Sequence, residues 1–203
     1  MKYKIKEFAK VSSGSTPARS KYDDFFLNGS VPWVKTMDLN NGVITVTDEK
    51  ITSLAAKHCK PVKKGTVLVA MYGGFNQIGR TGLLAVEAST NQALSTIEVN
   101  EKICLPKYLI QYLNNYVNLW RRFAASSRKD PNITSNDVRD FPVILPPLPE
   151  QKAIANLLST WDKAIEKTER LIQAKEKRFY ALLSKLISDN GQLTTRKSDW
   201  KKV

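Results

Sequence analysis

The sequence predicts an α+β protein, in which a compact, mostly antiparallel β domain precedes one long coiled-coil helix. Short apolar stretches separated by turn-forming Gly, Asn and Ser fill residues 31–99, with no long helical pattern between them. An apolar pattern with alternate steps of four and three then runs over residues 149–188 without Pro or Gly after Pro149. We therefore expect a β domain over residues 1–148, a long coiled-coil helix over 149–189, and a tail over 190–203.

Composition indicates a folded protein with a polyanionic partner. Hydrophobic residues make up 42% of the 203 residues, enough for a core in one domain of about 150 residues. The formal net charge of +13 favours nucleic acid as the simplest partner. The alternative is a soluble protein that is merely basic.

Cysteine usage and the N-terminal sequence indicate the compartment. Cys59 and Cys104 are too few for a disulfide framework and suit a reducing environment. Met1–Lys6 contains no apolar signal segment, and no run approaches the roughly 18 apolar residues of a membrane span. We therefore expect a soluble, cytoplasmic protein with no membrane partner.

Five short strands are predicted in the β domain. Each is rich in β-branched or apolar residues and is bounded by turn signals such as Asn40-Asn41-Gly42 and Tyr72-Gly73-Gly74. The strands are expected at Val31–Lys35, Val43–Thr47, Thr66–Met71, Gly82–Val86 and Leu94–Val99. Their close spacing favours antiparallel pairing over a doubly wound sheet.

Helical elements are predicted after the strands. Pro106 opens an amphipathic helix to about Ala125, whose aromatic face suits a core better than a base-stacking platform. That face comprises Leu109, Tyr112, Leu113, Tyr116, Trp120 and Phe123. Ser135 is expected to cap a short helix over residues 136–139. The four prolines of Pro142–Pro149 predict a stiff extended linker that aims the long helix.

The long helix carries a row of heptad-spaced positions, eight of ten of them apolar. Pro149 suits the first helical position, and Asn190-Gly191 supplies a stop. The row consists of Ile154, Leu158, Trp161, Ile165, Thr168, Ile172, Lys175, Phe179, Leu182 and Leu186. Because the chain has no second helix of this length, we expect a homodimer in which the apolar members of the row pair with another copy. The alternative is that the helix packs on its own domain.

The candidate DNA-binding residues are centred on residues 72–80. Glycines allow close backbone approach, Asn and Gln side chains pair with adenine, and Arg pairs with guanine. The residues in this segment are Tyr72, Gly73, Gly74, Asn76, Gln77 and Arg80. Supplementary contacts are expected from Lys35, Thr36, Asn91, Gln92, Arg128 and Lys129. The alternative is that this segment is a tight hairpin whose tip carries polar side chains without a binding role.

No catalytic, metal or cofactor site is predicted. His58 is the sole histidine and has only Cys59 beside it, which is a poor metal donor set. No phosphate-binding loop of the Gly-x-x-x-x-Gly-Lys type occurs. Ile144–Leu148 superficially resembles the Asn-Pro-Pro-aromatic motif of amino-methylating DNA enzymes, but it lacks both the Asn and the aromatic residue.

Several motifs together resemble the specificity (S) subunits of type I restriction-modification systems, over nearly the full length. The most specific is the run Leu145–Ala155, which opens the long helix with Pro-Glu-Gln and continues to Asp162. The weaker motifs are Gly14-Ser15-Thr16-Pro17, Val31-Pro32-Trp33, Gly65-Thr66-Val67-Leu68 and Asn91-Gln92-Ala93.

The resemblance implies a non-catalytic DNA-recognition subunit. Members of the family normally carry two recognition domains and two long antiparallel helices. Methyl transfer belongs to the modification (M) subunits, and cleavage and translocation to the restriction (R) subunit. The expected partners are therefore double-stranded DNA, a second copy of the chain, and the M and R subunits.

This chain departs from the family pattern in having one domain and one helix. Asp199–Val203 looks like the beginning of a second repeat, since Met1–Lys6 enters the first in a similar way. We therefore expect a half-length S subunit that dimerises to recognise a bipartite, symmetric site. Two alternatives are a coiled-coil adaptor with non-specific DNA affinity, and a stand-alone methyltransferase or nuclease with an unrecognised site.

Overall fold

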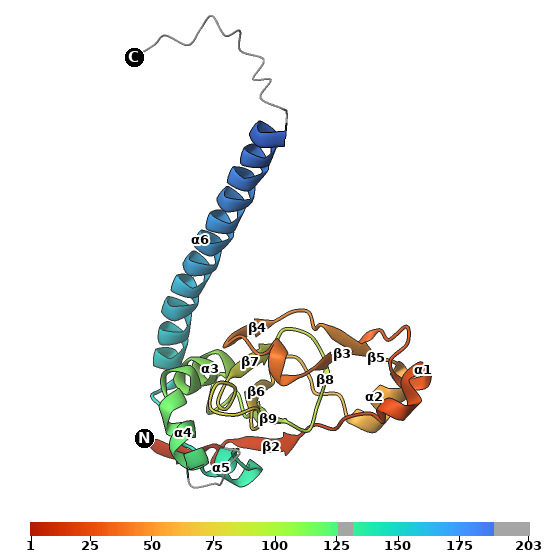
Figure 1. Ribbon diagram of the computed structural model, residues 1–203. Helices are drawn as coiled ribbons and strands as arrows, with labels where there is room; N and C mark the ends of the chain where they lie inside the picture. Colours follow the sequence, from red (N-terminus) through yellow and green to blue (C-terminus); the bar gives the residue numbers. More distant parts are fainter. Residues whose placement is uncertain (126–131, 189–203) are drawn as a thin grey trace, which may run out of the picture. The chain divides into compact units, whose positions relative to one another are not determined.

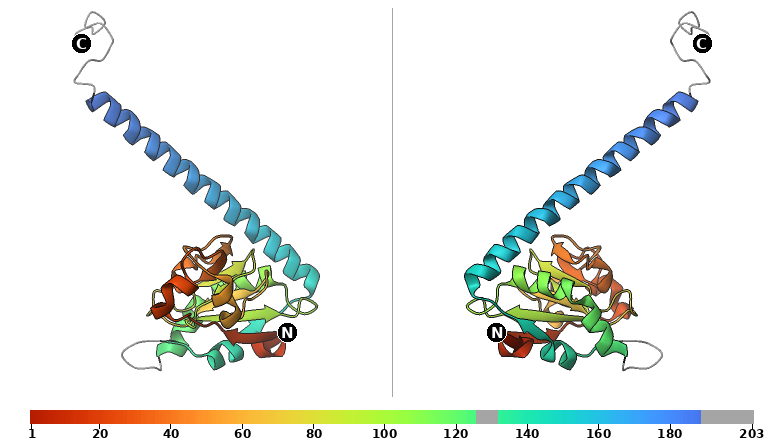
Figure 2. Two further views of the ribbon diagram at one scale, coloured as in Figure 1. Left: turned by 90° about the vertical axis from the view of Figure 1, so that its right-hand side faces the viewer. Right: turned by 90° about the vertical axis from the view of Figure 1, so that its left-hand side faces the viewer.

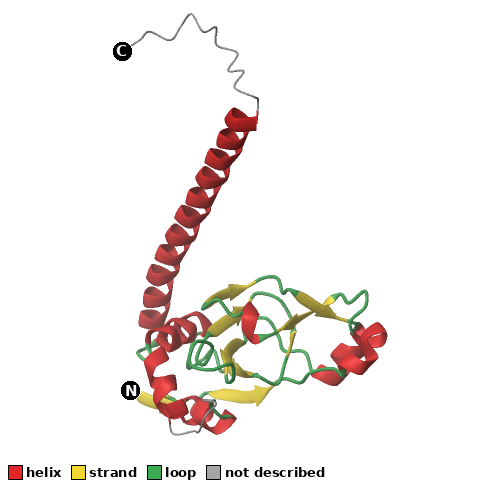
Figure 3. Cartoon of the chain, in the orientation of Figure 1, coloured by secondary structure: helices red, strands yellow, loops and turns green. Residues whose placement is uncertain are grey.

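The computed structural model describes residues 1–125 and 132–188. Contacts divide the chain into two compact units, Met1–Asn156 and Leu157–Val203. The first unit holds all the strands of the described chain and contains short strands joined by loops (Figure 3). The α+β class expected from the sequence is confirmed, and five of the seven strand pairs are antiparallel.

A five-stranded sheet forms the centre of the first unit (Figure 1). Its order is β2 (Ala9–Ser13), β9 (Leu94–Val99), β6 (Val67–Ala70), β7 (Thr81–Leu84) and β4 (Gly42–Ile44). All four residues of β6 are buried, because the strand is central and both of its faces are covered. Its apolar run therefore lacks the alternation of a half-exposed strand.

A smaller three-stranded sheet has its own core. Its order is β5 (Glu49–Ile51), β3 (Val31–Val34) and β8 (Ser89–Thr90), and β3 runs parallel to β8. Helices α1 (Tyr22–Phe25) and α2 (Ser53–Cys59) lie at this end of the unit (Figure 1). The core consists of Phe26, Trp33, Ile51, Ala55, Ala56 and Cys59.

The remaining helices lie at the other end of the unit. The amphipathic segment expected over residues 106–125 is helical but divided at Tyr116, into α3 (Pro106–Asn115) and α4 (Val117–Ala125). Its predicted core face is mostly confirmed, since Leu109, Leu113 and Trp120 are fully buried. The Trp120 ring stacks on Phe141 with 3.8 Å between centroids. Tyr116, by contrast, is 38% exposed.

Two local predictions were wrong. The expected linker begins with strand β10 (Pro142–Ile144), which pairs with β1 (Lys2–Lys4) and buries Val143 completely. Long-range pairing with the N-terminus therefore makes this segment part of the domain.

Helix α5 (Ser135–Asp140) is capped one residue earlier than expected, by Thr134. The Thr134 hydroxyl accepts from the Asp137 amide at 3.2 Å, and the Asp137 carboxylate accepts from the Thr134 amide at 2.7 Å.

The long helix, α6 (Leu148–Ser188), is unbroken over 41 residues (Figure 2). It begins one residue before Pro149, and the expected stop at Asn190-Gly191 lies outside the described residues. The side chain of Gln151 is fully buried in the first turn. Its Oε1 accepts from the Leu105 amide at 2.9 Å, and its Nε2 donates to the carbonyls of Ile103 (3.0 Å) and Pro146 (2.9 Å). The Pro-Glu-Gln motif therefore anchors the beginning of the helix to the first unit.

Candidate nucleic-acid interface

Three segments singled out in the sequence meet beyond the ends of strands β3, β6 and β8. The amide of Asn91 donates to the Val34 carbonyl at 3.0 Å, which brings Asn91-Gln92 beside Lys35-Thr36. The amide of Met71 donates to the Ala93 carbonyl at 2.8 Å, which brings the loop at residues 72–80 to the same place. We call these three segments the loop cluster.

The loop at residues 72–80 connects β6 to β7, which pair antiparallel. The segment is therefore the tip of a hairpin, as the alternative to a DNA-binding loop proposed. Gly73 and Gly74 have φ values of +111° and +75°, which disfavour other residues. The amides of Gln77 and Ile78 both donate to the Gly74 carbonyl at 3.0 Å. This turn places Phe75 and Asn76 at its apex.

The side chains of the loop differ in exposure. Tyr72 and Phe75 are 45% and 47% exposed, and Asn76 is exposed as well. Gln77 and Arg80 are half-buried. The Gln77 Nε2 lies 3.7 Å from the sulfur of Met37, in the turn that follows β3. This contact joins the loop to the Lys35-Thr36 segment.

Two amide oxygens in the loop cluster are buried without a hydrogen-bond partner among the described residues. They are Oε1 of Gln77 and Oδ1 of Asn91. An unpaired buried acceptor costs about 1–3 kcal/mol. Such groups call for an explanation in a folded protein, such as an ordered water or an ion.

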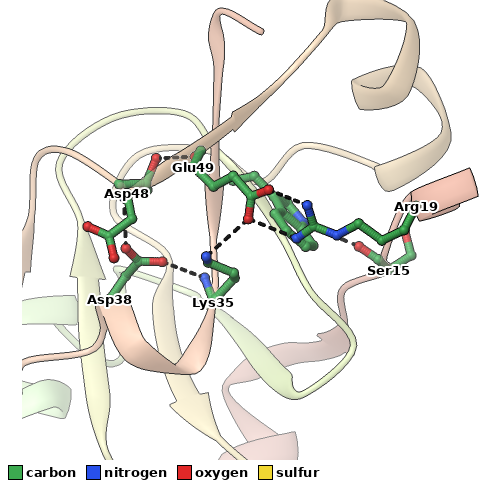
Figure 4. Close-up of polar contacts among 8 residues, drawn as sticks. Ser15, Arg19, Lys35, Asp38, Asp48 and Glu49 are labelled. Atoms are coloured by element: carbon green, nitrogen blue, oxygen red, sulfur yellow. Dashed lines mark hydrogen bonds and ion pairs between the residues drawn. The ribbon is translucent and has the colours of Figure 1, made fainter. Parts of the chain in front are cut away.

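An ion-paired group lies beside the loop cluster (Figure 4). The Glu49 carboxylate accepts from both terminal nitrogens of Arg19, one of them at 2.8 Å, and lies 3.0 Å from the Lys35 ammonium. The hydrogen bond from Arg19 is the main cause that lowers the pKa of Glu49 to about 2. The Arg19 guanidinium also lies over the rings of Phe26 (4.2 Å) and Trp33 (5.3 Å). Lys35, expected as a DNA contact, is therefore already paired in the free chain.

Sequence reasoning missed Arg19, Glu49, Met37 and Phe75. Arg19 and Glu49 are 30 residues apart and follow no shared periodicity. Phe75 was passed over because an apolar residue in a glycine-rich loop carries no recognised pattern. The signal that could have identified Phe75 is its position next to Asn76 and Gln77, whose side-chain amides are predicted to contact bases.

The Gly-Ser-Thr-Pro motif has a structural role next to the loop cluster. A Cβ on Gly14 would lie 2.1 Å from the Thr90 carbonyl oxygen, so the chain there passes too close to β8 for a side chain. The Ser15 amide donates to the same carbonyl at 2.9 Å. The motif therefore holds the N-terminal segment against β8, immediately before Asn91.

Arg128 and Lys129 lie outside the described residues. The chain beyond them is anchored beside the loop cluster, since the amide of Ile133 donates to the Met71 carbonyl at 3.0 Å.

The residues expected to mediate dimerisation fall into two groups. Ile154 is partly buried and packs against the core of the first unit. The other seven expose 38–63% of their surface: Leu158, Trp161, Ile165, Ile172, Phe179, Leu182 and Leu186. Large apolar side chains beside this row are exposed too, at Leu157, Leu171, Leu183 and Ile187.

Among the described residues, no group of three or more His, Cys, Asp or Glu is arranged to hold a metal ion. Burial raises the pKa of the Cys104 thiol to about 12, so this thiol stays protonated at neutral pH. The described helices also include none that is long and apolar enough to cross a membrane.

Comparison with known proteins identifies the family. The chain matches the family described as Type I restriction modification DNA specificity domain over residues 1–176. It is 23% identical over 181 residues to the type I restriction enzyme EcoR124I/EcoR124II specificity subunit of Escherichia coli, covering 85% of this chain and 44% of that protein. It is 25% identical over 179 residues to the MjaIX specificity subunit of Methanocaldococcus jannaschii, covering 86% of this chain and 40% of that protein.

Structural similarity points the same way. The fold resembles the solved type I restriction-modification S subunit from M. genitalium, with a TM-score of 0.63 and 17% identity over 87% of this chain and 42% of that one. The chain spans less than half the length of each of these relatives. Because the family match extends over residues 1–176 and the motifs noted in the sequence agree with it, the chain belongs to the type I restriction-modification DNA specificity domain family.

Proposed function

We propose that this chain is the sequence-specific DNA-binding subunit of a type I restriction-modification complex, and that it directs M and R subunits to their sites. The observation that carries the proposal is the loop cluster, which gathers amide and cationic side chains at one place in a domain of this family. The formal net charge of +13 supports attraction to the DNA backbone.

The loop cluster supplies two kinds of DNA contact in this proposal. Base edges are contacted by amides and a guanidinium, from Asn76, Gln77, Arg80, Asn91 and Gln92. Positioning contacts to phosphate and sugar come from Lys35, Thr36, Tyr72, Gly73 and Gly74 of the cluster, and from Arg128 and Lys129 outside it. Lys35 exchanges its ion pair with Glu49 for a phosphate, or else orients the neighbouring Thr36 while it stays paired.

The domain roles follow the division expected from the sequence. In this proposal residues 1–148 recognise DNA, and residues 149–189 form the spacer and dimerisation helix. The first compact unit extends to Asn156, so the first turns of α6 also serve the recognition domain. The pairing surface of the helix then begins at Leu157.

A homodimer explains the exposed apolar row of α6. Every described side chain from Thr160 to Ile187 is exposed in the single chain. Seven large apolar side chains at heptad spacing gain roughly 1.5–3 kcal/mol each when fully buried, which is ample for a stable helix pair. Two-fold pairing of antiparallel helices presents two identical domains, and therefore favours two inverted half-sites separated by an unread spacer.

Catalysis is assigned to the partner subunits. The described residues offer no metal cluster, and the buried Cys104 thiol is held protonated. The single histidine, His58, is exposed, and its ring centroid lies 5.9 Å from that of Phe25. The chain's contribution in this proposal is recognition alone, without a cofactor of its own.

The test is co-expression with the cognate M subunit, followed by mapping of methylated sites in plasmid DNA. The expected result is methylation confined to one bipartite sequence with inverted half-sites, and no methyl transfer by the purified chain alone. Methylation without sequence preference would contradict the recognition role and would favour a coiled-coil adaptor. Reproducible methyl transfer by the chain alone would contradict the non-catalytic role.

A further inference from the structure

The apex of the loop at residues 72–80 carries an aromatic ring, Phe75, that is 47% exposed. We propose that Phe75 reads the methyl group of a thymine in the major groove, next to the base contacted by Asn76. This inference rests on the proposed function, because it assumes that the loop cluster meets DNA.

The exposure of Phe75 sets it apart from the other phenylalanines of the first unit. Phe8, Phe26 and Phe141 are buried, and Phe25 and Phe123 pack partly buried against a core. Phe75 alone among these is 47% exposed. Tyr72 in the same loop and Met37, which contacts Gln77, are exposed as well, and a group of exposed apolar side chains is typical of a contact surface.

The turn holds the backbone that carries the ring in a defined position. The Gln77 and Ile78 amides both donate to the Gly74 carbonyl, which closes the backbone beneath Phe75 and Asn76. A Cβ on Gly73 would lie 2.7 Å from the Cβ of Gln77, which shows how tightly the two sides of the loop approach. The backbone of this turn therefore loses little conformational entropy when the loop binds.

The chemistry around the ring selects the ligand. Thymine is the base that presents a methyl group in the major groove, and adenine is the base that an Asn amide pairs with there. Phe75 and Asn76 are consecutive at the apex, so together they suit adjacent positions of an A·T-containing half-site. Tyr72 (45% exposed) lies in the loop cluster and Met37 (69%) directly follows its Lys35-Thr36 segment, and both add apolar surface. The minor groove is a poorer fit, because it does not distinguish A·T from T·A.

The experiment replaces thymine by uracil, which removes the methyl group and leaves the pairing edge unchanged. The half-site is first mapped with the M-subunit complex, and each thymine is then replaced singly by deoxyuridine in a fluorescent duplex. For the parent complex, we expect binding to fall about fourfold at one thymine, the equivalent of about 0.8 kcal/mol for one buried methyl group. Phe75→Ala should bind the thymine duplex more weakly and should bind both duplexes equally at that position.

Two variants control the measurement. Phe75→Leu keeps an apolar side chain and should retain part of the thymine preference. Leu54→Ala removes a 50% exposed apolar side chain from α2 and should leave the parent ratio unchanged. Thermal unfolding of each variant shows whether the domain remains folded.

The outcomes separate this inference from the proposed function. Sequence-specific binding with no uracil effect at any thymine, or an equal effect in Phe75→Ala, would overturn the role of Phe75 alone. A Phe75-dependent rise in 2-aminopurine fluorescence, which reports unstacked bases, would also overturn it, since Phe75 would then act as a wedge. Binding by the parent complex without any sequence preference would overturn both proposals.

Discussion

Arg19 and Glu49, 30 residues apart in the sequence, form a two-point ion pair in which both terminal guanidinium nitrogens donate to the carboxylate (Figure 4). The pair connects the segment after β2 to strand β5 and places Glu49 where Lys35 also reaches it. The geometry of this edge of the loop cluster therefore depends on one carboxylate with two cationic partners.

Replacing Glu49 by Gln is expected to lower the free energy of unfolding by about 1–2 kcal/mol. The reason is that Arg19 and Lys35 lose their counter-charge, with partial screening by solvent. Urea unfolding at neutral pH measures the change. Glu87→Gln is the matched control, because Glu87 is exposed and should shift the free energy by less than about 0.5 kcal/mol.

The same contact predicts a pH dependence. The folded-state pKa of Glu49, about 2, lies below its ordinary value of 4.5. Its contribution is therefore complete above about pH 4.5 and is lost as the pH falls towards about 2. The stability difference between parent and Glu49→Gln should be constant from pH 6 to 8 and should narrow below about pH 4.5. A difference that grows on acidification would contradict the ion-pair explanation.

Gln151→Leu is expected to destabilise the first unit by about 2–4 kcal/mol. Leucine has a similar volume, but it leaves the Leu105 amide and the Ile103 and Pro146 carbonyls without the bonds that Gln151 makes. Thermal or urea unfolding measures the loss. Lys152→Gln, one residue further along the helix and exposed, serves as the control. Equal stability of parent and Gln151→Leu would show that the Pro-Glu-Gln motif has no anchoring role.

Replacing both Leu158 and Phe179 by Asp is expected to convert a dimer into a monomer. Each substitution places a carboxylate where the pairing surface is apolar, at a cost of several kcal/mol. Light scattering at tens of micromolar should report the change in mass. Gln173→Asp with Ala181→Asp adds two carboxylates to the opposite side of the helix and should leave the dimer intact. A monomeric parent would contradict self-pairing, unless the M subunit supplies the partner helix.

Whether the two α6 helices pair parallel or antiparallel can be tested at the residues that flank the apolar row. In the heptad assignment, Asp162, Glu169 and Glu176 occupy one flank, and in an antiparallel pair this flank faces its own copy. Like charges then repel across the interface, typically by about 0.3–0.5 kcal/mol for each pair. Glu169→Gln with Glu176→Gln should tighten an antiparallel dimer several-fold, as measured by sedimentation. No change would favour parallel helices, in which this flank faces Leu157, Ala164 and Leu171.

Part of the architecture could be predicted because its signals are local. The row of α6 follows from helix periodicity, and the strands near residues 67–70, 81–84 and 94–99 lie within a residue or two of their expected positions. Strands β1, β2, β5, β8 and β10 were missed. They are short or charged, and β1 and β10 are defined only by pairing across most of the chain.

The candidate site divides in the same way. The sequence by itself determined which residues have the chemistry to read DNA, since Asn76, Gln77, Arg80 and Asn91 were chosen by side-chain type alone. The sequence also predicted the long apolar row, because its heptad spacing is contained in one helix. Only the tertiary structure decided that the three segments meet, that Lys35 is paired with Glu49, and that Phe75 is exposed at a turn apex. These facts depend on hydrogen bonds and packing between residues tens of positions apart, for which the sequence carries no periodic signal.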